Sequence, residues 1–261
     1  MKQPGKLKRL FPLICFVLVC RSGFAQSNYS YDLKKDLVIG SLSLGVFITP
    51  FFFDNKPAAV PTSLHKGDVN GFDRYFMLPY NKGLDITSDI SAYVLLALPA
   101  LSVAAQIRDK DALLSYGIMY AEAFLLTYGT KEILKSAIIR YRPYMYDGGI
   151  PSGKGDDYYN SFPSGSAALA FMSAGFLSST FSKEYPDSPW KLPLVFISYG
   201  LAAGIGAARI VSGSHFLSDV LTGAAIGSLY GYLIPFLHLK KKDSSVAFYP
   251  NPGGFMLSWS F

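Results

Sequence analysis

The stretch Ser161–Phe181, SFPSGSAALAFMSAGFLSSTF, joins a Pro-Ser-Gly turn to a long run of small and apolar residues. The run from Ser164 onward approaches the length of about 20 residues that a tilted helix needs to cross a membrane. Backbone N–H groups at the start of a helix are unpaired and attract anions. The stretch therefore predicts a helix with an anion-binding start, where Ser164 adds a hydroxyl donor and Gly165 permits close approach. An ordinary helix cap at Ser164 is the alternative.

Five further apolar stretches of similar length lie along the chain. Their many Gly, Ala and Ser residues permit close helix packing in lipid, and half of all residues are hydrophobic. The pattern predicts an all-α bundle of six helices embedded in a membrane, with a soluble bundle as the alternative. Glu122 lies within one stretch, so we expect it to face the bundle interior and find a partner. The five stretches are Leu37–Phe53, Ile90–Ile107, Ala112–Thr127, Leu192–Ile210 and Val220–Leu239.

The chain begins with the features of an export signal. A basic segment precedes the short apolar run LFPLICFVLVC, and the small residues Gly23 and Ala25 mark a cleavage site before Gln26. We expect residues 1–25 to be a cleaved signal peptide, with a short membrane anchor as the alternative. Cleavage removes five basic residues and lowers the net charge from +6 to +1, so no nucleic-acid partner is expected. Both cysteines are removed as well, which leaves no thiol nucleophile.

The remaining chain divides into two parts. Residues 26–239 contain the six apolar stretches and predict one helical domain. Residues 240–261 form a C-terminal tail in which NPGG, residues 251–254, separates two short alternating runs. Such a turn signal between alternating runs predicts a short β-hairpin.

Positive charge predicts how the bundle is oriented. Lys183, Lys191 and Lys240 flank apolar stretches at one end, which favours the cytoplasmic side for that end. The loops around Arg142 and His215 are then expected to face the cell exterior. A cleaved signal also places the new N-terminus outside, and the two expectations agree only if Leu37–Phe53 does not fully cross.

The segment KSAIIRYRP begins with Lys135 and carries Arg142 directly before its final proline. Lys135 and Arg142 are seven residues apart, so a continuing helix places both on one face before Pro143 stops it. The pair predicts a site for an anion. A basic collar that meets lipid headgroups is the alternative.

The segment ARIVSGSHFLSDV contains an arginine, a histidine and an acid. His215 and Asp219 are four residues apart, so on a helix the carboxylate can hold the imidazole and leave one ring nitrogen free. Arg209 lies six residues before His215. A structural histidine at a helix end is the alternative. Together with the other two motifs, this segment predicts a site that binds a phosphate-like oxyanion and presents a nucleophile to it. The three cations supply the countercharge, so no metal is expected.

The three motifs in this order resemble the signature of the type 2 phosphatidic acid phosphatase superfamily. That superfamily also contains bacterial acid phosphatases, undecaprenyl-diphosphate and lipid A phosphatases, and vanadium haloperoxidases. The resemblance implies a helical phosphomonoesterase or diphosphatase without a cofactor. It implies that His215 attacks phosphorus to form a phosphohistidine and that Asp219 orients His215. It also implies that phosphate is bound by Lys135, Arg142, Ser164, Gly165 and Arg209.

The chain departs from that signature at Ser166. The family pattern places there a histidine that protonates the leaving group, which contributes roughly 10²–10⁴ in rate. A serine hydroxyl is far too weak an acid for this at neutral pH. Either the substrate has a good leaving group, as a diphosphate does, or another acid such as Asp156 or Asp157 substitutes. The third possibility is a weak or inactive protein that binds phosphate or lipid headgroups.

Four functions are compatible with these features. The first is a membrane phosphatase for a lipid phosphate or diphosphate, with its site facing the periplasm or exterior. A soluble periplasmic acid phosphatase is the second, and a non-catalytic membrane binding protein is the third. A helical transporter is the fourth, and it leaves the spacing of the three motifs unexplained.

Overall fold

The computed structural model describes residues 27–53, 56–61, 63–106, 109–240, 246–251 and 254–259. The expected signal peptide, residues 1–25, lies outside the described residues. The described part is mostly helical, which confirms the predicted class. Its seven α-helices are α2 (Leu33–Ile48), α3 (Gly71–Tyr75), α4 (Lys82–Gln106), α5 (Lys110–Ala137), α6 (Gly165–Glu184), α7 (Lys191–Val211) and α8 (Leu217–Leu237).

The helix count differs from the six predicted because α3, a helix of five residues, forms in the long loop after residue 53. Its start is capped by Asn70, whose side-chain oxygen accepts the Asp73 N–H at 3.0 Å. Four short 3-10 helices complete the helical elements, namely η1 (Thr49–Phe52), η2 (Lys66–Asp68), η3 (Pro143–Tyr146) and η4 (Asp156–Tyr159). In the tail, β1 (Val246–Asn251) and β2 (Gly254–Trp259) pair antiparallel, with Asn251 opposite Gly254.

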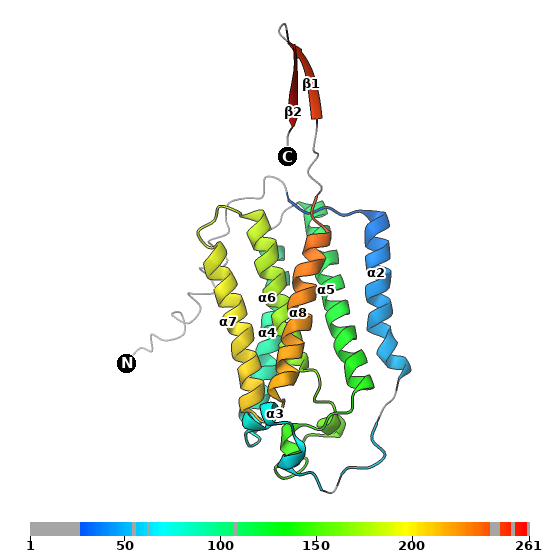
Figure 1. The fold of residues 1–261 in the computed structure, drawn as a ribbon, viewed down its shortest axis with the longest axis vertical. Coiled ribbons are helices and arrows are strands. Elements are labelled where there is room, and N and C mark those ends of the chain that lie inside the picture. The colour runs from blue at the N-terminus through cyan, green and yellow to red at the C-terminus, as the bar shows by residue number, and fades with distance from the viewer. Residues whose placement is uncertain are drawn as a thin grey trace, which may run out of the picture.

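Helix α6, which begins within the stretch Ser161–Phe181, is the central helix of the bundle. It packs against α8, α7, α4 and α5, while α2 packs on the outside of α5 (Figure 1). The contact with α8 is close because Gly223, Gly227 and Gly231 repeat once per turn along α8. A Cβ added at any of the three would overlap a backbone oxygen of residue 164, 168 or 172 near or within α6. Small residues at this spacing let helix backbones touch.

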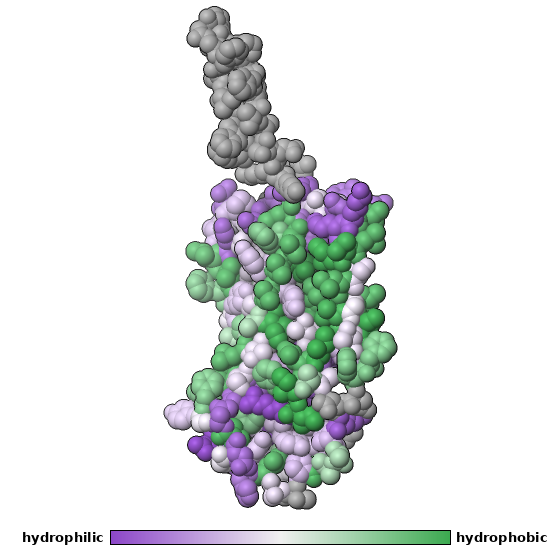
Figure 2. Space-filling model, turned by 45° about the vertical axis from the view of Figure 1, so that its right-hand side comes forward, coloured by the Kyte–Doolittle hydropathy of each residue, from purple (hydrophilic) through white to green (hydrophobic). Residues whose placement is uncertain are grey.

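The outer surface of the bundle is apolar in its middle. Figure 2 shows hydrophobic residues over the central part of one face and hydrophilic residues toward both ends. Leu37 on α2, Phe196 on α7 and Leu229 on α8 are each more than half exposed. Among the described residues, four segments are long and apolar enough to cross a membrane: Leu33–Phe52, Lys82–Ser102, Lys191–Val211 and Leu217–Leu237. These features fit a membrane protein, because so much exposed apolar surface is unfavourable in water.

Glu122 faces the interior of the bundle, as predicted. Its side chain is buried between helices, and Oε2 lies 3.3 Å from Nε2 of His238, which follows α8. Asp36 of α2 approaches the same ring nitrogen at 3.0 Å. The acid therefore has a basic partner, as an ionisable group at membrane depth requires.

The two ends of the bundle have different roles. At one end the chain enters α2 and leaves α8, where Tyr29 forms a β-bridge with Leu239. At the opposite end lie α3, the segment between α5 and α6, and the turn between α7 and α8 (Figure 1). Helices α4 and α5 extend beyond the predicted apolar stretches at this second end, and the added turns carry charged residues. The three sequence motifs meet there.

Candidate active site

A cavity of about 260 Å³ lies at this end, walled by α4, α5, α6, α7 and the loop segments around Arg142 and His215. Most of the predicted site residues line it, although they come from separate parts of the chain. Two do not: Ser164 and Asp219 are fully buried and lie outside the lining. The predicted residues in the lining are Lys135, Arg142, Gly165, Ser166, Arg209 and His215.

Arg142 reaches the cavity by strand-like pairing rather than on a helix. Helix α5 ends at Ala137, so the expectation of one helix face shared with Lys135 is wrong. β-Branched residues follow, and Pro143 favours an extended backbone at Arg142, where φ is −72° and ψ is 155°. The N–H of Arg142 donates to the Tyr158 carbonyl at 2.9 Å. This pairing brings the arginine beside the loop that precedes α6.

His215 is held by contacts at both ring nitrogens. Nδ1 lies 2.8 Å from the carbonyl oxygen of Ser161, and Nε2 lies 3.0 Å from Nη1 of Arg142. A carbonyl and a guanidinium have fixed roles as acceptor and donor. Nδ1 must therefore carry the hydrogen, and the lone pair of Nε2 accepts the Arg142 N–H beside the cavity.

The charge state of His215 follows from the same surroundings. Burial lowers the pKa of its imidazole well below the ordinary value, and the positive charges of Arg142, Arg209 and Lys135 lower it further. The ring is therefore neutral at physiological pH. A neutral imidazole with a defined tautomer is the form that can act as a nucleophile.

Asp219 does not hold His215 in the predicted way. His215 precedes α8 instead of lying on it, and its Nδ1 is 3.7 Å from Oδ2 of Asp219, beyond hydrogen-bond length. Oδ2 instead accepts the Ser161 hydroxyl at 2.6 Å and the Phe216 N–H at 2.9 Å. Asp219 thus fixes Ser161, and the Ser161 carbonyl fixes His215. The acid acts on the histidine through one intermediate residue.

Arg140, which the sequence analysis did not single out, balances this buried acid. Its guanidinium forms ion pairs with Asp219 and with Asp73, the latter at 2.6 Å. It also lies over the ring of Phe216, with 4.4 Å from Cζ to the ring centroid. Arg140 therefore joins α3, the start of α8 and the segment that carries Arg142.

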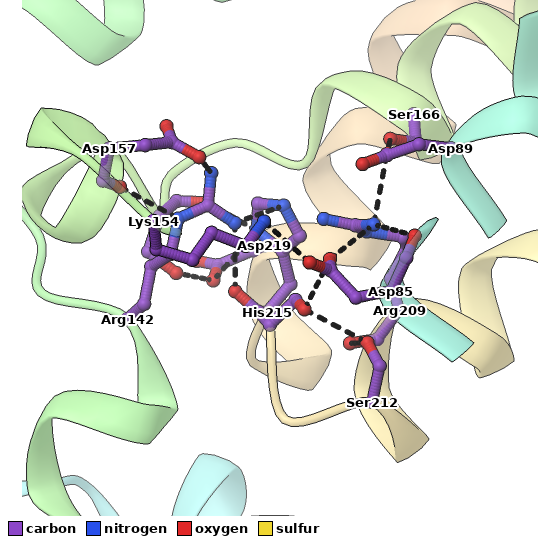
Figure 3. A network of polar contacts seen from close by, with 12 residues as sticks. Asp85, Asp89, Arg142, Lys154, Asp157, Ser166, Arg209, Ser212, His215 and Asp219 are labelled. Atoms are coloured by element: carbon purple, nitrogen blue, oxygen red, sulfur yellow. Dashed lines mark hydrogen bonds and ion pairs between the residues drawn. The ribbon is translucent and has the colours of Figure 1, made fainter. Parts of the chain in front are cut away.

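Arg209 is anchored from behind by a buried aspartate of α4. Its Nη1 lies 2.8 Å from Oδ1 of Asp85, which also accepts the Ser214 hydroxyl at 2.7 Å. The second oxygen of Asp85 pairs with Lys154 at 2.5 Å. The network in Figure 3 shows these residues around one carboxylate. Arg209 is thereby fixed in position at the cavity wall.

The turn that opens α6 behaves differently from an ordinary cap. Ser164 is the N-cap residue, but its side chain makes no capping hydrogen bond. Its Oγ and the Nε of Arg209 are buried and have no hydrogen-bond partner in the described part of the chain. Two buried donors without partners suit a site that receives an anion. Gly165 also fits tightly, since an added Cβ would lie 3.2 Å from Cδ of Lys131.

Lys131 is a further cation that the sequence analysis missed. It lies one turn before Lys135 on α5, lines the cavity and is buried. Its Nζ pairs with Glu132 and lies 3.7 Å from the ring centroid of Tyr128. The spacing of four residues from Lys135 was the available signal. The cavity thus has two lysines and two arginines in its wall.

Two carboxylates of the cavity wall pair with its arginines. Asp157 approaches Nη2 of Arg142 at 2.5 Å, and Asp89 of α4 approaches Nη1 of Arg209 at 2.9 Å. Asp89 also accepts the Ser166 hydroxyl at 2.6 Å. The side chain of Asp156 lies outside the described part. No group of three His, Cys, Asp or Glu side chains suited to a metal ion is found among the described residues.

Comparison with known proteins gives a family for this arrangement. The PAP2 superfamily pattern matches residues 116–243. A lipid A 1-phosphatase from Porphyromonas gingivalis is 44 % identical over 75 residues, which is 28 % of this chain and 15 % of that protein. The chain therefore matches only a small part of the length of this curated relative.

Two solved structures are also similar. Aquifex aeolicus LpxE has 23 % identity and a TM-score of 0.44, over 66 % of this chain and 98 % of that one. A transmembrane PAP2 type phosphatidylglycerolphosphate phosphatase from Bacillus subtilis has 18 % identity and a TM-score of 0.43, over 87 % of this chain and 94 % of that one. The pattern match covers Lys135, Arg142, Arg209 and His215, and residues 116–243 of the chain therefore belong to the PAP2 superfamily.

Proposed function

We propose that the chain is a metal-independent phosphatase that hydrolyses a lipid phosphate or diphosphate through a phosphohistidine intermediate. The observation that carries this proposal is the arrangement at His215. Its Nδ1–H is held by the Ser161 carbonyl, and its Nε2 lone pair lies beside Arg142 at the cavity. A fixed, neutral nucleophile surrounded by cations suits attack on an anionic phosphate.

The reaction follows from these positions. Nε2 of His215 attacks phosphorus, and the bond to the leaving group breaks on the opposite side. Negative charge on the phosphoryl oxygens is stabilised by cations that are already in place, which costs no reorganisation during the reaction. Water then attacks the phosphohistidine and releases inorganic phosphate. The proposed phosphate ligands are Lys131, Lys135, Arg142, Ser164, the Gly165 N–H and Arg209.

Two observations support a membrane lipid as the substrate, and a third supports a cavity that faces the cell exterior. The middle of the bundle surface is apolar, and four segments are long enough to span a membrane. The matched relative from Porphyromonas gingivalis is a lipid A 1-phosphatase. The end of α6, the start of α7 and the end of α8 lie opposite the end that carries the cavity (Figure 1). Lys183, Lys191 and Lys240 belong to or directly follow these helix ends, which favours a cavity that faces the cell exterior.

Activity measurements on the purified protein test the proposal. We expect wild type to hydrolyse at least one of phosphatidate, undecaprenyl diphosphate and an aryl phosphate. His215→Ala should abolish turnover, while His65→Ala, which changes an exposed histidine outside the cavity lining, should not. Brief reaction with labelled substrate should trap an acid-labile phosphoprotein in wild type only. Unchanged turnover in His215→Ala would contradict the assignment of the nucleophile.

A non-catalytic binding protein is the second candidate, and Ser166 is the observation that favours it. In that case wild type binds inorganic phosphate or phosphatidate vesicles but turns over none of the three substrates. A soluble acid phosphatase is distinguished by fractionation, because it is released by salt or osmotic shock. The proposed enzyme requires detergent for release.

A further inference from the structure

Ser166 and Asp89 form a pair on the cavity wall that has no part in the nucleophilic step. Ser166 is in the first turn of α6, and its hydroxyl donates to Oδ1 of Asp89 at 2.6 Å. The same oxygen lies 2.9 Å from Nη1 of Arg209. Both residues line the cavity, and the Asp89 side chain is 38 % exposed. The carboxyl group is therefore positioned by two contacts and open to a bound substrate.

We propose that Asp89, positioned by Ser166, is the acid that protonates the leaving-group oxygen when the phosphate bond breaks. This inference rests on the phosphatase activity proposed above. Asp89 is then a catalytic residue, and Ser166 is a positioning residue.

The chemistry requires such a group. An alkoxide leaves phosphorus poorly unless it is protonated as the bond breaks, and a positioned acid contributes roughly 10²–10⁴ in rate. The Ser166 hydroxyl is too weak an acid to do this, but it can orient a carboxyl group. Both contacts of Asp89 use Oδ1. Its Oδ2 can therefore carry the proton toward the substrate.

The position of Asp89 distinguishes it from Asp157, the other carboxylate beside an arginine of the site. Asp157 pairs with Arg142, which itself contacts the attacking nitrogen of His215. In Figure 3 Asp157 lies at one side of the network, and the Ser166–Asp89 pair lies at the other, with His215 between them. Attacking and leaving atoms are roughly in line across phosphorus. The carboxyl group of Asp89 lies on the side away from Arg142 and His215, so it is the carboxyl group suited to protonate the leaving atom.

Substrate binding provides the reason for Asp89 to take up a proton. Arg209 from α7 neutralises the carboxylate of Asp89. The other ionisable groups around the cavity are Lys131, Glu132 and Lys135 from α5, Arg142 and Asp157 from the loops, and the neutral His215. A phosphate dianion competes for Arg209 and places negative charge beside Asp89. Adjacent negative charges repel each other, so we expect the complex with substrate to favour the protonated carboxyl group of Asp89.

The proton balance of the reaction is then complete. The P–Nε2 bond forms and the P–O bond to the leaving group breaks, while the proton of Asp89 passes to the departing oxygen and yields an alcohol. Asp89, now ionised, accepts a proton from the water that attacks the phosphohistidine. Breaking the P–Nε2 bond releases phosphate and restores both groups.

Asp89→Asn tests the inference through its dependence on the leaving group. We expect kcat for an alkyl phosphate to fall about 100-fold or more. For 4-nitrophenyl phosphate, whose leaving group needs little protonation, we expect only a few-fold loss. Ser166→His in the Asp89→Asn background should restore much of the alkyl phosphate turnover. Asp157→Asn is the matched control, and its losses should be similar for both substrates.

Inhibition by inorganic phosphate shows whether Asp89→Asn retains a folded site. We expect this variant to bind phosphate with an affinity equal to or greater than that of wild type. Asp89→Glu, which keeps the acid, should retain more alkyl phosphate turnover than Asp89→Asn. Equal losses for both substrates in Asp89→Asn, with phosphate binding intact, overturn the role of Asp89. Absence of any wild-type turnover, or full activity in His215→Ala, overturns the proposed function instead.

Discussion

His215 is held in one tautomer by residues that lie far from it in the sequence. Ser161, which provides the carbonyl, is 54 positions away, and Arg142, which donates to Nε2, is 73 positions away. Burial lowers the pKa of the ring, and the neighbouring cations lower it further. Protonation would add a positive charge to a buried, already positive cluster, so the neutral ring persists as the pH falls through 6.5.

This state predicts a distinct nuclear magnetic resonance signature. The chain has three histidines, so ¹⁵N-histidine labelling in detergent gives few signals, and His65→Ala, His215→Ala and His238→Ala assign them. We expect the His215 signals at pH 6 to be those of a neutral Nδ1–H ring. The signals of a protonated ring at this pH would contradict the pKa direction and the proposed nucleophile.

The site residues differ in how far the sequence could predict them. Lys135, Arg142, Arg209 and His215 stood in recognisable spacings, and the structure brings them to one cavity. Asp89 could not be predicted, because it lies on another helix, 77 positions from Ser166, and its segment carries no motif. The role of Asp219 could not be predicted either. Asp219 acts on His215 through Ser161, and these contacts depend on the folded backbone. Residue spacing predicts contacts along one helix but not contacts between distant loops.

At the scale of elements, the position of the site depends on the contact between α6 and α8. Gly223 of α8 lies against the backbone oxygen of Ser164, so the turn that precedes α6 rests directly on α8. The Ser164 N–H also donates to the Asp219 carbonyl at 3.0 Å. The length of the apolar stretches predicted α6 and α8. It could not predict that α4 and α5 extend beyond their own apolar stretches into the charged turns of the site. Those turns are polar, and capping and tertiary contacts determine where they end.

Replacing a glycine of this contact should therefore destabilise the bundle. Gly227→Ala places a methyl group into the backbone of α6 near Ala168, where α6 cannot yield without moving. We expect a loss of about 2 kcal/mol or more in detergent, in the range for overpacked sites. Thermal or denaturant unfolding measures the change.

Gly200→Ala is the matched control, because an added Cβ on α7 meets no atom within 4 Å. Alanine favours helix over glycine by about 1 kcal/mol, so this variant should be unchanged or more stable. A similar response of both variants would show that helix propensity, rather than the close contact, determines the effect.

At the scale of the whole molecule, the bundle has a catalytic end and an opposite end, the basic end, which is flanked by Lys183, Lys191 and Lys240. Helix α2 meets the length and apolarity of a membrane span and starts at the end where α8 finishes. If α2 crosses, residue 27 lies on the same side as Lys240, which is the cytoplasmic side by the charge rule. A crossing α2 contradicts the expectation that Leu37–Phe53 does not fully cross. A cleaved signal, which places the new N-terminus outside, then conflicts with an outward-facing cavity.

Cysteine labelling resolves the orientation. In a Cys15→Ser/Cys20→Ser background, Ser152→Cys introduces an exposed thiol at the catalytic end, and Asp187→Cys introduces one at the basic end. We expect a membrane-impermeant maleimide to label only the first in intact spheroplasts. Both should react after permeabilisation. The reverse pattern would mean that the cavity faces the cytoplasm.

The bridge between Tyr29 and Leu239 has a practical consequence for engineering. The Lys240 N–H donates to the Asn28 carbonyl at 2.9 Å, so the chain enters and leaves the bundle at one point. A short linker can join these positions, and new termini can open in the turn between α6 and α7 at the same end. Such a circular permutant keeps every catalytic element continuous and leaves the mouth of the cavity free of tags.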